Sequence, residues 1–67
     1  MNEADALVEE LEPAVDRHGL KTVLQALVTL CHLKTEHLSS NWGDGRSARV
    51  WQQAAKRIER AAQLVEV

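Results

Sequence analysis

Apolar residues recur every three or four positions in three separate stretches of the chain, and this helical spacing limits the fold more than any other feature. The spacing places the apolar side chains of each stretch on one face of a helix. Signals for strands are absent, because the chain has no Tyr or Phe and no stretch alternates strictly between apolar and polar residues. The pattern predicts an all-α fold: a small helical bundle with an antiparallel helical hairpin over residues 20–65 and an N-terminal helix over residues 3–18.

Pro13 and Gly19 define the N-terminal helix. Proline removes a backbone donor and clashes with the carbonyl group four residues earlier, so this helix is predicted to be interrupted. Either it kinks at Pro13, or it breaks near Glu12 and restarts with Pro13 in its first turn. Gly19 supplies the left-handed residue that ends the helix. A loop rich in Ser, Asn and Gly, residues 39–45, separates the second helical stretch from the third.

The chain of 67 residues has room for one domain, residues 1–67. A chain of this length buries only about 60% of its unfolded surface, so we expect a thin margin of stability.

Cys31 is the only cysteine, which excludes a disulfide within the chain. The first residues are acidic where a secretory leader is basic, and no uncharged run is long enough to span a membrane. With a reduced thiol, these features predict a cytoplasmic protein without a membrane span.

The second stretch, residues 20–38, is apolar on more than one face. A surface helix needs an apolar stripe about 100° wide, and this one is wider. The helix is therefore either sandwiched between its neighbours or covered by another copy of the protein. We expect a small protein-association module, most simply a homodimer whose second helices bury one another. The residues predicted to form this self-association surface are Leu24, Leu27, Val28, Leu30, Cys31 and Leu33.

Charge is unevenly distributed along the chain. Residues 1–16 carry six acidic and no basic side chains, whereas residues 46–67 carry five basic and two acidic ones. The simplest interpretation is that the first and last helices lie side by side with their charges facing each other. The alternative is weak nucleic-acid binding through Arg49, Lys56 and Arg60. A net charge of −2 argues against a dedicated nucleic-acid binder, so nucleic acid is the less favoured partner.

Three histidines and Cys31 are the side chains that suggest a metal site or a nucleophile. Ligands on one helix meet at separations of three or four residues, whereas His32 and His37 are five residues apart and Cys31 is adjacent to His32. We therefore predict no metal, no cofactor and no catalytic residue, and we do not expect an enzyme. Trp42 lies in the loop, where it either closes the end of the helix pair or stands exposed as an anchor for a protein partner.

Five short motifs carry a resemblance to other proteins. They are Asp16-Arg17-His18-Gly19-Leu20, Cys31, Glu36-His37-Leu38, Asn41-Trp42-x-Asp44 and Trp51-x-x-Ala54-Ala55. In these motifs, over roughly residues 16–62, the chain resembles short helical proteins predicted from bacterial and phage genomes. The resemblance implies that the turn at Gly19 and the loop around Trp42 are shared features of that group. It implies no activity and no binding residue.

Overall fold

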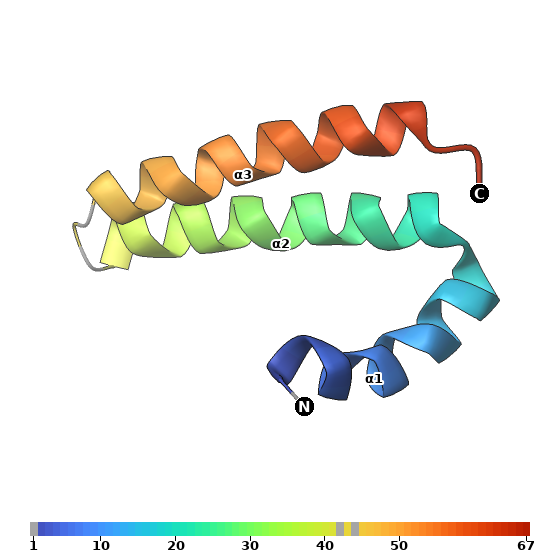
Figure 1. Cartoon of the computed structure of the whole chain (residues 1–67). Coiled ribbons are helices and arrows are strands. Elements are labelled where there is room, and N and C mark those ends of the chain that lie inside the picture. Colours follow the sequence, from blue (N-terminus) through green and yellow to red (C-terminus); the bar gives the residue numbers. More distant parts are fainter. Residues whose placement is uncertain (1, 42, 44) are drawn as a thin grey trace.

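Three α-helices make up the computed structural model, which describes residues 2–41, 43 and 45–67. Helix α1 spans Glu3–His18, α2 spans Leu20–Asn41 and α3 spans Gly45–Leu64. Helices α2 and α3 lie antiparallel and side by side, while α1 leaves the start of α2 in another direction (Figure 1). The described residues contain no strand. The predicted all-α fold, with an antiparallel hairpin over the second and third stretches, is therefore confirmed.

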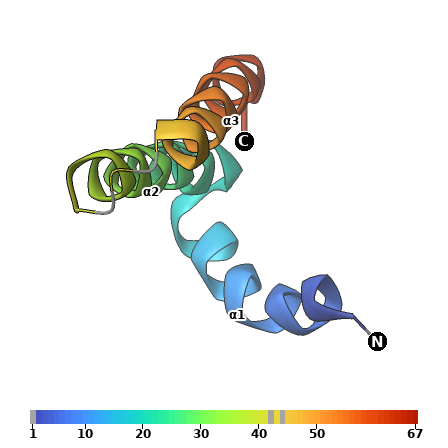
Figure 2. The same cartoon turned by 90° about the vertical axis from the view of Figure 1, so that its left-hand side faces the viewer.

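Helix α1 begins with a reciprocal pair of hydrogen bonds that satisfies two backbone amides at its start. The Asp5 N–H donates to Asn2 Oδ1 over 3.0 Å, and the Asn2 N–H donates to Asp5 Oδ2 over 3.4 Å. The helix then continues through Pro13 without a break. Its ribbon changes direction part-way along (Figure 2). Of the two alternatives for Pro13, the structure shows a continuous, bent helix rather than two separate ones.

Gly19 alone connects α1 to α2. Its N–H donates to the Val15 carbonyl oxygen over 2.8 Å, and its own carbonyl oxygen accepts from the Val23 N–H over 3.2 Å. Its φ of 87° is positive, as the sequence predicts, but its ψ of 154° is extended rather than left-handed helical. That combination is accessible almost only to glycine. A further bond, from the Lys21 N–H to the main-chain oxygen of Val67 over 2.7 Å, also holds the junction in place.

The seam between α2 and α3 is lined by small side chains. Ala48, Ala55 and Ala62 lie seven residues apart in α3, and all three are buried. A spacing of seven returns to the same side of a helix after two turns, so these alanines form one line along α3. Facing them is Cys31 of α2, which is also buried. The Thr35 hydroxyl donates to the Cys31 carbonyl oxygen over 2.9 Å and reaches the Ala48 carbonyl oxygen over 3.4 Å, which ties the two backbones together.

Helix α1 packs against the hairpin only near its own C-terminal end. Ala14 and Val15 are half-buried there, whereas the apolar residues further along, Leu7, Val8 and Leu11, are exposed. The helix contacts α2 but does not pack against α3. The interpretation that the acidic first helix and the basic last helix lie side by side is therefore wrong within one chain. The physical reason is the single-residue junction, which directs α1 away from α3 (Figure 2).

Candidate functional site

The folded chain exposes far more surface than a compact protein of its mass. Its accessible surface is 5667 Å², whereas a compact monomer of 7.5 kDa exposes about 4,250 Å². Its radius of gyration of 13.6 Å likewise exceeds the value of about 11 Å expected for its 67 residues. About 1,400 Å² per chain is therefore surface that a compact fold would have buried.

The six residues predicted to mediate self-association fall into two groups. One group lies on the side of α2 that packs on α3: Cys31 is buried, and Leu24 and Val28 are half-buried. Their side chains pack between α2 and α3 of the same chain. The other group is exposed, with 36, 52 and 56% of each side chain accessible. This exposed group consists of Leu27, Leu30 and Leu33. Leu33 lies about 160° from Cys31 around the helix, on the side of α2 away from α3, so Leu27 and Leu30 are the two that share one exposed side.

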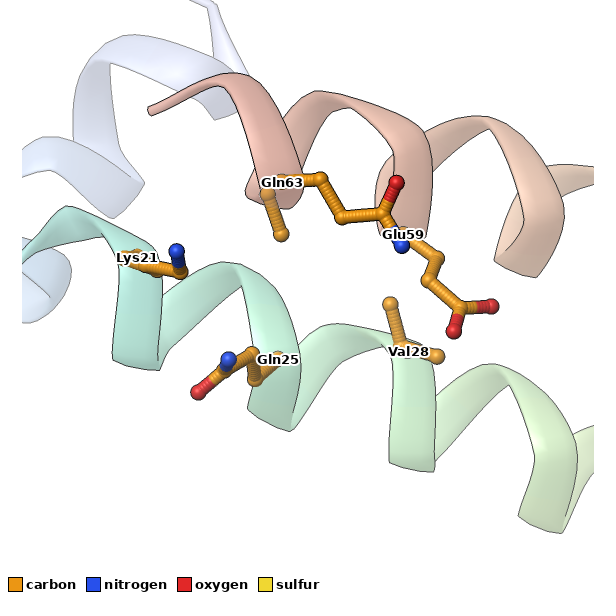
Figure 3. Close-up of a pocket in the computed structure, with 6 residues that line it drawn as sticks. Lys21, Gln25, Val28, Glu59 and Gln63 are labelled. Atoms are coloured by element: carbon orange, nitrogen blue, oxygen red, sulfur yellow. The ribbon is translucent and has the colours of Figure 1, made fainter. Parts of the chain in front are cut away.

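One side of the seam is polar. A shallow pocket on this side is lined by Lys21, Gln25 and Val28 of α2 and by Glu59 and Gln63 of α3 (Figure 3). Amides and charges of both signs face one another across the helix pair here. Such a mixture is typical of a solvated surface, so this polar side is a poor candidate for an interface.

The opposite side of the seam is apolar, and we call it the apolar flank. In an antiparallel helix pair, the positions beside the seam on one helix meet the equivalent positions of the other helix. Counting about 100° per residue from the buried positions places apolar residues of both helices on this side. The apolar flank consists of Leu20, Val23, Leu27 and Leu30 of α2 and of Val50, Trp51, Ala54, Ile58 and Ala61 of α3. Val23, Ala54 and Ile58 are half-buried and the others are exposed, Trp51 with 38% of its surface accessible. A largely exposed apolar surface of this kind is typical of an interaction site.

Basic side chains border the apolar flank. A shallow depression on α3, beside Val50 and Ala54, is lined by Arg46, Arg49 and Arg57 among others. On α2, the exposed Lys34 follows Leu27 by seven residues and therefore lies on the same side of the helix. The flank is thus an apolar surface with positive charge along its edges.

The three residues predicted to contact nucleic acid are Arg49, Lys56 and Arg60, and all three are exposed on α3. Their spacing of seven and four residues places them on one face of the helix. Lys56 and Arg60 lie further from the apolar flank than Arg57 does, toward the polar side. A row of exposed charges on one helix face is typical of a solvated surface, so it does not by itself indicate a binding site.

The remaining predicted features concern Trp42, metal sites and membranes. Trp42 lies outside the described residues, so its two alternatives stay predictions. In the described part of the chain, no three side chains of His, Cys, Asp or Glu come together in a group that could hold a metal ion. Cys31 is buried as a free thiol. No helix built from the described residues is long and apolar enough to cross a membrane.

Sequence reasoning missed two parts of the exposed surface. It placed the apolar stripe of α1, which we define as Leu7, Val8 and Leu11, inside a bundle, whereas all three residues are exposed. It also did not connect Arg46 and Arg57 with the apolar flank. The signal was present, because Arg46 precedes Val50 by four residues and Arg57 follows Ala54 by three, the spacings that bring side chains together on a helix.

No protein family, no curated protein and no solved structure matches the chain. The resemblance to short helical proteins from bacterial and phage genomes therefore stays a prediction. The candidate site rests on the geometry of this chain: an exposed apolar flank with basic edges.

Proposed function

We propose that this chain is a protein-association module that forms a homodimer through the apolar flank of its hairpin. The observation that supports the proposal is the excess surface of the single chain. A stable interface buries about 800 Å² on each partner, and this chain exposes about 1,400 Å² more than a compact monomer. A single buried thiol is typical of a reducing compartment, so the proposed location is the cytoplasm.

The energetics of the single chain also favour association. The buried side chains among the described residues are three alanines and one cysteine, and no large side chain is fully buried. A core of this kind contributes little, since fully burying a large aliphatic side chain contributes about 1.5–3 kcal/mol. Burying about 500 Å² of apolar surface per chain in a dimer would contribute roughly 12 kcal/mol per chain, or about 25 kcal/mol per dimer, against association costs of about 4–15 kcal/mol per dimer. Folding and pairing are therefore expected to be coupled.

Coupled folding and pairing predicts that the melting temperature rises with protein concentration. Each tenfold increase stabilises a dimer by about 1.4 kcal/mol relative to two unfolded chains, which corresponds to roughly 5 °C at this chain length. The measurement is thermal unfolding followed by circular dichroism at about 2, 20 and 200 µM. A melting temperature that does not change across this range would contradict the proposal.

The alternative function is weak nucleic-acid binding through Arg49, Lys56 and Arg60, whose exposure on one face of α3 is the observation in its favour. Six acidic side chains on α1 and a net charge of −2 oppose it. We therefore expect no binding tighter than about 10 µM at 0.15 M salt and no sequence preference. A fluorescence anisotropy titration of labelled duplex and single strands measures this. Submicromolar binding that is lost when all three residues are replaced by Gln would make nucleic-acid binding the better proposal.

A further inference from the structure

Helix α1 carries an apolar stripe with acidic edges. Leu7, Val8 and Leu11 recur on one face, and each of them is about half exposed, with 45 to 56% of its surface accessible. Glu10 and Glu12 lie on either side of Leu11, at about 100° from it around the helix. No described residue outside α1 covers this stripe fully, because α1 packs on α2 only near the junction. An amphipathic helix of this kind is expected to bury its apolar face against a partner.

The apolar flank of the hairpin is the complement of that stripe. It is an exposed apolar surface too, but its edges carry positive charge at Lys34 of α2 and at Arg46 and Arg57 of α3. The polar side of the seam offers neither an apolar centre nor charge of one sign. An acidic-edged helix and a basic-edged apolar surface match in both hydrophobicity and charge, which favours one specific docking arrangement.

The junction prevents α1 from closing on the flank of its own chain. Two antiparallel helices that pack on each other are joined by a loop of about 2–5 residues, whereas Gly19 is the only residue between α1 and α2. Its backbone is fixed by hydrogen bonds to Val15 and from Val23, and the Lys21 N–H bond to Val67 holds the next turn. Folding α1 back along α2 would break this junction, so α1 can lie only on the flank of another chain.

We propose that α1 of each chain lies on the apolar flank of a second copy, so that the homodimer exchanges its N-terminal helices. This inference rests on the proposed self-association and names the segment that performs it. Exchange of an identical element between two copies is a low-cost route to a symmetric dimer. Each chain then buries both its stripe and its flank, which accounts for an excess surface larger than the ~800 Å² that one partner needs for a stable interface.

The test exploits the opposite charges of the two surfaces. In the first variant, Glu10→Lys and Glu12→Lys give α1 basic edges; in the second, Arg46→Glu and Arg57→Glu give the flank acidic edges. Each variant alone places like charges together in the exchanged dimer, and we expect it to dimerise at least about tenfold more weakly than the wild type. Mixed together, the two variants restore both charge matches, and the heterodimer is expected to dominate. Native mass spectrometry of equimolar mixtures at low salt measures its fraction.

A matched control separates this docking from attraction between net charges. The control variant, Lys56→Glu with Arg60→Glu, has the same net charge as the acidic-flank variant, but its changes lie away from the apolar flank. Mixed with the basic-α1 variant, it should form clearly less heterodimer than the acidic-flank variant does. If the two mixtures give equal heterodimer while the wild type dimerises, the exchange of α1 is overturned and the homodimer stands. If the wild type itself is monomeric, both proposals are overturned.

Discussion

Replacing Ala55 by Leu is expected to lower the free energy of unfolding by about 2 kcal/mol, because adding methylene groups to a well-packed site typically costs 1–3 kcal/mol. Ala55 is the most deeply buried residue described, with no accessible surface, in the middle of the alanine line that lets α3 approach α2. A leucine there must push the two helices apart. In a domain of this size the loss corresponds to a fall in melting temperature of roughly 8–16 °C.

Ala6→Leu is the matched control for this change. It makes the same substitution, but Ala6 is exposed on α1 and lies about 140° around the helix from Leu11, away from the apolar stripe and from the apolar flank. We expect a change within about 0.5 kcal/mol, the usual range for a surface position. Chemical unfolding followed by circular dichroism, at one fixed protein concentration, compares the three proteins. Equal effects of the two substitutions would show that the seam is not closely packed at Ala55.

The helices and most of their ends could be predicted because their signals are local. The periodicity of the first stretch and the glycine after it predict a helix over residues 3–18, as α1 shows. The end of the second helix was predicted wrongly: the sequence placed residues 39–45 in a loop, because serines usually favour loops. Helix α2 continues to Asn41, and Ser39 fits within it because its hydroxyl donates to the Thr35 carbonyl oxygen one turn earlier, over 2.7 Å.

The side of α2 that packs on α3 could not be predicted in the same way. Apolar residues surround most of α2, so periodicity does not distinguish Cys31, which is buried, from Leu30, which is half exposed. The choice depends on shape, since Cys31 is small enough to lie fully against the alanine line of α3. The direction of α1 was equally out of reach, because it depends on the φ and ψ of the single residue Gly19. The charge pattern therefore indicated a pairing of acidic and basic helices but not whether it lies within one chain or between two.

Leu30→Glu is expected to weaken dimerisation at least about 100-fold, because each interface would lose a buried leucine side chain and would have to remove a carboxylate from water. Leu30 lies in the apolar flank with 52% of its surface exposed in the single chain. In a symmetric dimer the substitution is present twice, once on each flank. Each new carboxylate would also face the acidic edges of the partner's α1.

Thr29→Glu is the control for this substitution. Thr29 precedes Leu30 in α2, is also exposed, and points about 100° away around the helix, toward the polar side. It introduces the same charge into the same turn, and we expect the dissociation constant to change less than about threefold. Sedimentation equilibrium of both variants and the wild type gives the three constants. If the Leu30→Glu and Thr29→Glu variants had equal dissociation constants, the apolar flank would not be part of the dimer interface.

The molar mass of the wild-type protein in solution tests self-association most directly. Light scattering coupled to size-exclusion chromatography, with loading concentrations from about 1 to 300 µM, covers the range in which a dimer of moderate affinity assembles. We predict a mass that rises from that of the 7.5 kDa chain toward twice that value as concentration increases. A mass of 7.5 kDa at every concentration would contradict the account and leave the apolar flank to a different partner.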